Sequence, residues 1–190
     1  MAAPPEVNTL NLAGTYVMNK QLGDDPDEIL RLQGMSWFMR KLIASVTITL
    51  YVKHYKDDDG VEHIDVEQIG TGGFKGNFEP RQIDGQTRER DDAVFGPISG
   101  RTLRLKVEDL TDDFLKEGWL PDTVEHGIIE SFVESDTPKS GKTWIAIQTW
   151  GFADVKGERR HVRRVHFTGP KGEDITRVLV YDYLGPNTRS

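Results

Sequence analysis

The pattern of hydrophobic and polar positions changes after residue 44, from helical spacing to strict alternation. Before this point, Ile29, Leu30 and Leu32 form one apolar side of a short segment. After it, "SVTITLYVKHY" (45–55) places an apolar side chain at every second position. Side chains of a strand point alternately to its two faces, whereas helical faces repeat every three to four residues. The pattern therefore predicts a helical N-terminal segment followed by β structure.

The helical segment carries its own start and stop signals. Asp25 suits the N-cap and Pro26 the first helical position. Gly34 ends this helix after about two turns, and a second helix is expected over 36–43. Residues 25–43 thus form two short helices joined by a glycine turn, without the basic, polar face that reads a DNA groove.

The rest of the chain predicts a series of short strands. They are expected at 61–69, 74–78, 101–108, 127–134, 143–152, 159–168 and 175–183, with a short helix at 111–117. "DDDG" (57–60) predicts a hairpin turn between the first two strands. Many short strands joined by tight turns indicate an antiparallel barrel or sandwich.

The strand expected at 159–168 distinguishes between these two folds. Its two faces carry Arg160, Val162, Arg164 and His166 on one side and His161, Arg163, Val165 and Phe167 on the other. Each face contains an arginine, and a packed core does not tolerate an arginine without partners. This favours a barrel with a partly wet interior over a tightly packed sandwich.

Composition limits the class of protein. The 190 residues fit one domain, 1–190, in which we expect residues 1–10 to be flexible. The absence of cysteine excludes disulfides and thiolate chemistry and is compatible with a reducing compartment. No secretory signal and no apolar run of about 20 residues is present. We therefore expect a soluble, cytoplasmic protein without stable membrane insertion.

Charge argues against a nucleic-acid partner. The 24 basic and 31 acidic residues give a net charge of -7, which repels phosphate backbones. A local exception, "KGERRHVRRVH" (156–166), is basic, but its interleaved valines and histidines are typical of a half-buried strand. We predict no nucleic-acid binding and make no prediction of the oligomeric state.

Known catalytic and cofactor motifs are absent or incomplete. "TPKSGKT" (137–143) ends like a phosphate-binding loop, but Asp136 stands where that motif needs glycine, and a strand follows instead of a helix. "GTGGFKG" (70–76) follows a strand without opening a helix, so a dinucleotide site is not expected. We find no G-x-S-x-G nucleophile elbow. The sequence therefore predicts no cofactor and assigns no catalytic residue.

The five histidines do not form a metal motif. They occupy positions 54, 63, 126, 161 and 166, with no pair at helical metal-ligand spacing. His161 and His166 lie on opposite faces of their strand. A metal site would need long-range convergence of these side chains, and we predict none.

The N-terminal third resembles the cytosolic fatty-acid-binding proteins, the intracellular lipid-binding branch of the lipocalin-like (calycin) barrels. Gly14-Thr15-Tyr16 stands where that family has Gly-x-Trp, and "NKQLGDDPDEIL" (19–30) supplies the turn and first helix. Gly34 precedes Arg40-Lys41 at the family's spacing. The resemblance implies an all-β fold, a single antiparallel β-barrel with a helix-turn-helix lid at 25–43, one extra short helix, and an insertion at 109–142.

A second match lies near the C-terminus. The family's last strand carries Thr-Arg-x-Tyr, whose Arg and Tyr hold a ligand carboxylate. Here "ITRVLVYDY" (175–183) matches with Thr176 and Arg177, and Tyr181 comes two residues late on the same face of the strand. The family's second inward arginine corresponds to Arg163 or Arg164, which lie on opposite faces.

Our first hypothesis is that the barrel binds and carries a fatty-acid-like molecule with an acidic or polar head. The resemblance implies that Arg177, Tyr181 and Arg163 meet the head. Trp144, Gln148 and Trp150 share one strand face that would enclose the chain, unless they are simply core. Met35, Trp37 and Phe38 would form the inner surface of the lid, or plug the end of the barrel.

Two other hypotheses remain open. The same barrel could be a cofactor-free cyclase or isomerase of a hydrophobic, polyketide- or terpenoid-like intermediate, working mainly through positioning. A barrel packed solid would instead indicate an interaction module. Selectivity separates the first two, because a carrier accepts a series of fatty acids and a cyclase converts one substrate.

Overall fold

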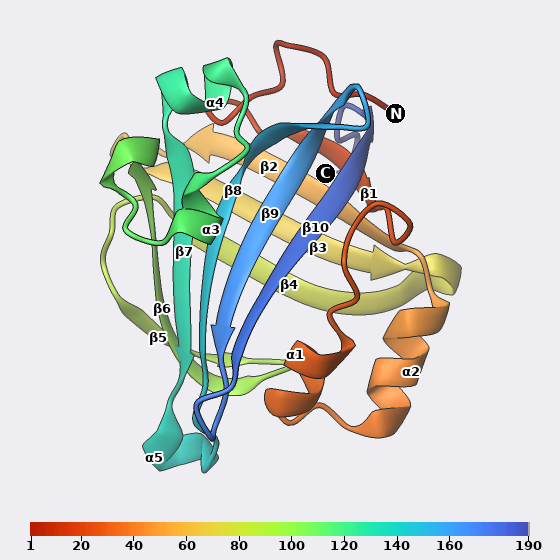
Figure 1. Ribbon diagram of the computed structural model, residues 1–190, viewed down its shortest axis with the longest axis vertical. Coiled ribbons are helices and arrows are strands. Elements are labelled where there is room, and N and C mark those ends of the chain that lie inside the picture. The colour runs from red at the N-terminus through yellow and green to blue at the C-terminus, as the bar shows by residue number, and fades with distance from the viewer. Residues whose placement is uncertain (190) are drawn as a thin grey trace.

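The computed structural model describes residues 1–189 and places ten strands in one antiparallel sheet. The strands are β1 (Gly14–Met18), β2 (Ile48–Lys56), β3 (Glu62–Gly70), β4 (Phe74–Gln82), β5 (Arg88–Asp92), β6 (Gly96–Leu105), β7 (Ile128–Ser135), β8 (Ile145–Val155), β9 (Glu158–Thr168) and β10 (Asp174–Gly185). Their order is β4-β3-β2-β1-β10-β9-β8-β7-β6-β5. The sheet curls into a nearly closed barrel (Figure 1), which confirms the fold class expected from the sequence.

The barrel has one seam, between the edge strands β4 and β5. Side chains close it: Asn77 Nδ2 donates to Asp92 Oδ2 at 3.0 Å, and both residues are buried. Farther along, Ile83, just after β4, forms a parallel bridge with Thr102 of β6. The seam is therefore held by polar side chains and a single bridge in place of a regular ladder.

Two helices after β1 form the expected lid. They are α1 (Asp27–Leu32) and α2 (Trp37–Ser45), at the lower end of the barrel in Figure 1. Gly34 between them has φ +85°, which glycine adopts without steric cost. Ser36 caps α2 by accepting from the Met39 N–H at 3.3 Å. Asp25, expected as the cap of α1, lies one residue too early, and the N-cap position is taken by Pro26.

The remaining helices are short. They are α3 (Asp113–Lys116), α4 (Pro121–His126), α5 (Thr137–Ser140) and the 3₁₀ turns η1 (Thr71–Gly73) and η2 (Val107–Asp109). We did not expect α4, α5 or β5 from the sequence. A helix of four to six residues gives too few turns for a periodic signal, and β5, "RERDD", has no apolar residue to show alternation.

The segment with α3 and α4 packs on the outside of β8 and β9. Thr149 Oγ1 donates to the Leu115 carbonyl at 3.0 Å, and Arg164 donates to the Phe114 carbonyl at 3.1 Å. The Phe152 N–H donates to Thr123 Oγ1 at 3.0 Å. This segment covers part of the outer wall of the barrel.

The N-terminal residues 1–13, which we call the strap, cross the end of the barrel opposite the lid (Figure 1). We expected residues 1–10 to be flexible; the structure places Ala3 and Val7 in the core, at 3% and 5% exposure. The Ala3 N–H donates to the Arg159 carbonyl at 2.8 Å. The strap therefore buries its apolar side chains against the barrel and covers this end of it.

The core has a separate cluster at each end of the barrel. The strap end contains Tyr16, Trp150 and Phe152, and the lid end contains Ile29, Trp144 and Phe167. Among residues 1–189, none of the helices combines the length and the apolar character that a membrane crossing requires.

Candidate functional site

Strand β9 supplies the central side chains of the interior. His161 and Arg163 are 3% and 5% exposed. Arg164 points outward, toward Phe114 and Glu117 of the outer segment. The ladders place Arg163 between Trp150 of β8 and Leu179 of β10. Of the two arginines left open by the sequence, Arg163 is the inward one.

The guanidinium of Arg163 lies on an aromatic platform. Its Cζ is 4.0 Å from the centroid of the Trp150 ring and 5.4 Å from that of Tyr181. The Trp150 indole is held in place because its Nε1 donates to Gln148 Oε1 at 3.0 Å. A cation over a desolvated aromatic face gains about 2 kcal/mol. This contact compensates only part of the cost of burying a charge.

A carboxylate nearby is engaged mainly by other groups. Glu79 Oε2 accepts from Arg81 at 2.8 Å, and Glu79 Oε1 accepts from Gln68 at 2.6 Å. The Arg163 Nη1 is 3.9 Å from Glu79 Oε2, too far for a good hydrogen bond. Burial raises the pKa of Glu79, but Arg81 and Arg163 outweigh that effect and hold it below its usual value. Glu79 is therefore a carboxylate that neutralises only one of the two guanidiniums.

Arg81 completes this polar side of the interior. It donates to Ser131 Oγ at 2.7 Å, and its Cζ lies 4.9 Å from the centroid of the Trp150 ring. At the seam, Asp92 is paired with Arg90 at 3.1 Å. Arg81 and Arg90 are thus paired with Glu79 and Asp92, whereas Arg163 has no hydrogen bond within residues 1–189. Of these three guanidiniums, Arg163 is the one without a hydrogen-bonded carboxylate.

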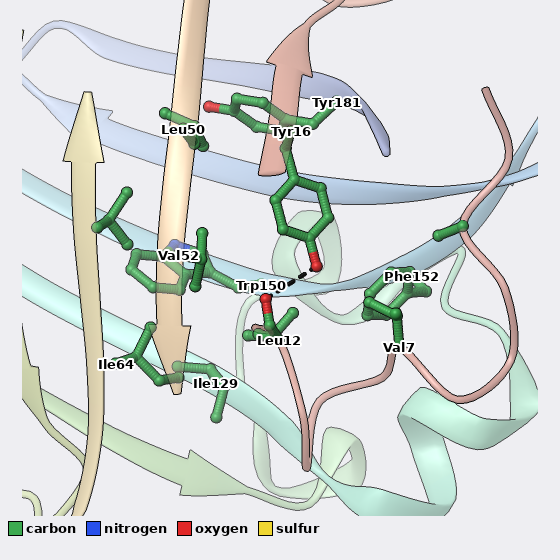
Figure 2. Close-up of a cluster of buried hydrophobic side chains, with 12 residues drawn as sticks. Val7, Leu12, Tyr16, Leu50, Val52, Ile64, Ile129, Trp150, Phe152 and Tyr181 are labelled. Atoms are coloured by element: carbon green, nitrogen blue, oxygen red, sulfur yellow. Dashed lines mark hydrogen bonds between the residues drawn. The ribbon is translucent and has the colours of Figure 1, made fainter. Parts of the chain in front are cut away.

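Tyr181 lies beside Arg163. It is 2% exposed, and burial raises its pKa above the ordinary value, so that the hydroxyl stays protonated. Within the described chain its hydroxyl makes no hydrogen bond. Tyr16, by contrast, donates to the Leu12 carbonyl at 2.9 Å, the dashed line in Figure 2. Tyr181 therefore retains a free donor next to the guanidinium.

A small cavity opens at this point. Its volume is about 10 Å³, room for about one water molecule. Its wall includes Leu12, Tyr16, Val66, Trp150, His161 and Arg163. Figure 2 shows the surrounding side chains converging from the strands and from the strap. Apart from this cavity, aromatic and paired polar side chains fill the interior around Arg163, which we expected to be partly wet.

The other predicted site residues lie toward the lid. Arg177 is four residues before Tyr181 on β10, or about 13 Å away along the strand. Its Nε donates to the Asp25 carbonyl at 3.0 Å. Trp144 belongs to the core cluster below the lid, with Ile29. The structure thus brings Tyr181, Trp150, Gln148 and Arg163 together and separates them from Arg177 and Trp144.

The lid residues face solvent. Trp37 and Phe38 are 65% and 70% exposed, and Met35 is half-buried. No residue of α2 is fully buried. In this structure α1 covers the lid end of the interior, and Trp37 and Phe38 take no part in covering it.

Sequence reasoning missed Glu79 and Arg81. We expected the strand to end at Phe78, whereas β4 continues to Gln82. The signal was present in "NFEPRQ", where Phe78 and Pro80 alternate with the inward polar side chains. Polar residues on an inward face break the usual apolar alternation, so the pattern was not recognised.

No group of three or more His, Cys, Asp and Glu side chains within residues 1–189 has an arrangement that could hold a metal ion. The chemistry available to the interior is hydrogen-bond donation and acceptance, a positive charge and aromatic surface.

Comparison with known proteins finds two relatives that span nearly the whole chain. A probable pericyclase, scpY of Mollisia scopiformis, is 32% identical over 189 residues, covering 97% of this chain and 96% of the relative. The pericyclase pydY of Acremonium sp is 30% identical over 190 residues, covering 98% of each chain. No family model matches the sequence.

Solved structures share the fold at low sequence identity. Lipid binding protein 8 of Caenorhabditis elegans aligns with a TM-score of 0.57 and 11% identity, over 91% of this chain and 95% of that one. Fatty-acid-binding protein 1 of Echinococcus granulosus aligns with a TM-score of 0.53 and 12% identity, over 91% and 97%. These matches show the fatty-acid-binding-protein fold that the N-terminal motifs indicated.

Proposed function

The chain belongs to the family of these two pericyclases, and on that premise we propose that it catalyses a cofactor-free pericyclic ring closure of a long, largely apolar polyene inside its barrel. The observation that carries this proposal is the alignment of nearly the whole chain with both pericyclases. It corresponds to the second of our sequence-based hypotheses, a cyclase of a polyketide- or terpenoid-like intermediate.

The geometry suits this reaction class. In a pericyclic step the new bonds form in one concerted rearrangement of π electrons, so the protein needs no nucleophile and no acid-base pair. Holding the two ends of a flexible chain in a reactive conformer can supply about 7–11 kcal/mol of the barrier. An interior with aromatic walls at both ends, built around Trp150 and Trp144, can impose such a conformer.

Arg163 would supply the electronic assistance. A hydrogen bond from a cation to a carbonyl draws electron density from the conjugated alkene and makes it a better partner for an electron-rich diene. Because Arg163 is 5% exposed and lacks a hydrogen-bonded carboxylate, water and protein groups compete little for it. Tyr181, protonated and adjacent, is the second donor to the same oxygen.

The small cavity implies that the barrel opens to admit a substrate. About 10 Å³ does not hold a polyene, so the interior side chains, the lid or the seam must move. Arg177, bound to the Asp25 carbonyl beside the lid, and the exposed Trp37 and Phe38 are placed where an entering chain would pass. In this role Arg177 guides the ligand and does not meet the reacting group.

The test is a ring-closure assay. The purified protein is incubated with a linear trienone, a conjugated diene tethered to an enone, and with a longer-chain analogue. We expect faster closure and a changed ratio of ring isomers, both lost in Arg163→Met. Closure at the uncatalysed rate with the uncatalysed isomer ratio, for every trienone of a series of tether lengths, would refute the proposal.

Carriage of a hydrophobic molecule is the second candidate, favoured by the shared fold with fatty-acid-binding proteins. Native mass spectrometry with a mixed set of fatty acids separates the two. A carrier retains several fatty acids on gentle desolvation, whereas a ring-closing enzyme retains none tightly and still converts the trienone.

A further inference from the structure

We propose that His161 is a substrate-binding residue: a neutral hydrogen-bond acceptor that acts with Arg163 to recognise a head group in which an N–H or O–H donor lies next to a carbonyl oxygen. A primary amide, with one N–H cis to its carbonyl oxygen, and an α-hydroxy ketone both present such an edge. The inference rests on the proposed function, because it describes the group that the barrel would hold during ring closure.

The tautomer of His161 follows from its one contact with the backbone. Its Nδ1 lies 3.1 Å from the Gly151 carbonyl oxygen. A carbonyl oxygen only accepts, so Nδ1 carries the hydrogen, and in the neutral ring Nε2 keeps its lone pair. Within residues 1–189 Nε2 makes no hydrogen bond, and His161 is part of the cavity wall. The free acceptor is therefore available to a molecule in the cavity.

The surroundings keep the ring neutral. Burial, and to a smaller extent the nearby Arg163, lower the pKa of His161 to about 3. The groups that face the ring are aromatic: Tyr16 from β1, Phe152 from β8 and Tyr181 from β10, with centroids 5.2, 5.6 and 5.4 Å away. Both tyrosines have raised pKa values because they are buried, so neither supplies a negative charge.

The position of His161 relative to Arg163 makes a donor–acceptor pair. The two residues are two apart on β9 and face the same side, which separates their Cα atoms by about 7 Å. Both line the one small cavity. At this spacing Arg163 can donate to a carbonyl oxygen of the ligand while His161 Nε2 accepts from an N–H or O–H beside that oxygen. A fatty-acid carboxylate, which only accepts, would leave His161 unsatisfied.

Binding of two simple amides tests the inference without ring closure. Dodecanamide has an N–H cis to its carbonyl oxygen, and N,N-dimethyldodecanamide has no N–H, while both keep the carbonyl and the apolar chain. We expect the wild-type protein to bind the first about tenfold more tightly, because the second leaves a buried acceptor unpaired. His161→Phe, which keeps a ring among the three aromatic neighbours, should abolish this difference. Arg163→Met should weaken both amides alike.

Nitrogen-15 NMR of the histidine rings provides a readout on the wild-type protein, which remains informative if His161→Phe does not fold. We expect His161 to show a hydrogen on Nδ1 and a bare Nε2, unchanged between pH 5 and 8, and a shift of the Nε2 resonance on adding dodecanamide. A hydrogen on Nε2, or titration within that range, would overturn the inference.

The outcomes distinguish this inference from the proposed function. Equal binding of the two amides, or binding of neither, overturns the role of His161 and leaves the trienone assay to judge ring closure. Discrimination between the amides without any ring closure supports the binding role and counts against the reaction.

Discussion

The guanidinium of Arg163 lies 4.0 Å from the centroid of the Trp150 ring, and the two residues are direct partners in the β8–β9 ladder. This contact defines the polar centre of the barrel. It leaves the hydrogen-bonding edge of the guanidinium without a hydrogen-bonded carboxylate, at 5% exposure. A buried charge in this state costs several kcal/mol of stability, which points to a role in binding or catalysis.

Replacing Arg163 should separate activity from stability. Arg163→Met removes an unmatched buried charge, so we expect an unchanged or higher midpoint of urea unfolding, with ring closure slowed about 100-fold. Arg163→Lys should retain part of the rate, since it keeps the charge and loses the planar fork. Arg164→Met is the matched control: it breaks the outward contact with Phe114 and should lower stability while leaving the rate unchanged. Equal rates in both methionine variants would contradict the assignment.

Removing the buried carboxylate should have the opposite effect. Glu79→Gln leaves Arg81 without its ion pair, and we expect a loss of about 3–5 kcal/mol in the free energy of unfolding. Because the folded-state pKa of Glu79 is lowered, its stabilisation is present above the unfolded pKa and is lost as pH falls through the folded value. Urea unfolding at pH 7 measures the effect. Glu89→Gln, whose side chain is 69% exposed, should change stability by less than about 0.5 kcal/mol.

The strap should contribute to stability through Leu12. This residue is 2% exposed, its N–H donates to His54 Nδ1 at 2.9 Å, and its carbonyl accepts from Tyr16. Leu12→Ala keeps both backbone bonds and leaves a cavity, so we expect a cost of about 2–5 kcal/mol in urea unfolding. Leu10→Ala, at a position 54% exposed, is the control and should be nearly neutral. A neutral Leu12→Ala would show that the strap does not form part of the folded core.

His166 should make the attachment of the outer segment dependent on pH. Its Nδ1 contacts Asp112, the N-cap of α3, and its Nε2 lies 2.5 Å from Asp174. Burial lowers the pKa of His166, but the two carboxylates outweigh burial and raise it above 6.5. The stabilisation is therefore full below pH 6.5 and is lost as pH rises through the raised value.

The measurement for His166 is the difference in Tm between wild type and His166→Asn from pH 5.5 to 9. We expect this difference in Tm to be largest at acidic pH and to shrink above neutrality. The corresponding change in the free energy of unfolding should stay below about 1 kcal/mol because the cluster is partly exposed. A difference in Tm that stays constant with pH would show that the histidine is not charged in the folded protein.

The lid aromatics should be dispensable for folding. Trp37→Ala and Phe38→Ala alter side chains that are 65% and 70% exposed, so we expect changes in stability within about 0.5 kcal/mol. Trp144→Ala, at 2% exposure, should cost about 3–5 kcal/mol by the same thermal unfolding assay. A weaker affinity for dodecanamide in the two lid variants, with unchanged Tm, would show that the lid turns inward over a ligand. A large loss of Tm in Trp37→Ala would contradict the exposed placement.

The face of each residue on β9 was predictable, because side-chain direction alternates with a period of two along any strand. The sequence therefore paired Arg163 with His161 and set Arg164 apart. Which of these two faces points inward was not predictable, since both carry an arginine. The packing of α3 against Arg164 decided it.

The sequence by itself determined the all-β barrel and the helix-turn-helix lid with its turn at Gly34, because these depend on local spacing and chirality. Its resemblance to the fatty-acid-binding proteins supplied Tyr181 and Arg163 as candidate site residues, and strand alternation supplied Trp150 and Gln148. The tertiary structure alone decided which of them meet. Ladder register joins residues far apart in the chain. It places Tyr181 opposite His161 and about 13 Å from Arg177 along the strand. It also brings Glu79 of β4 near Arg163 across the interior. Register is set by burial over the whole sheet, so no local pattern could have located the unmatched charge at the centre of this barrel.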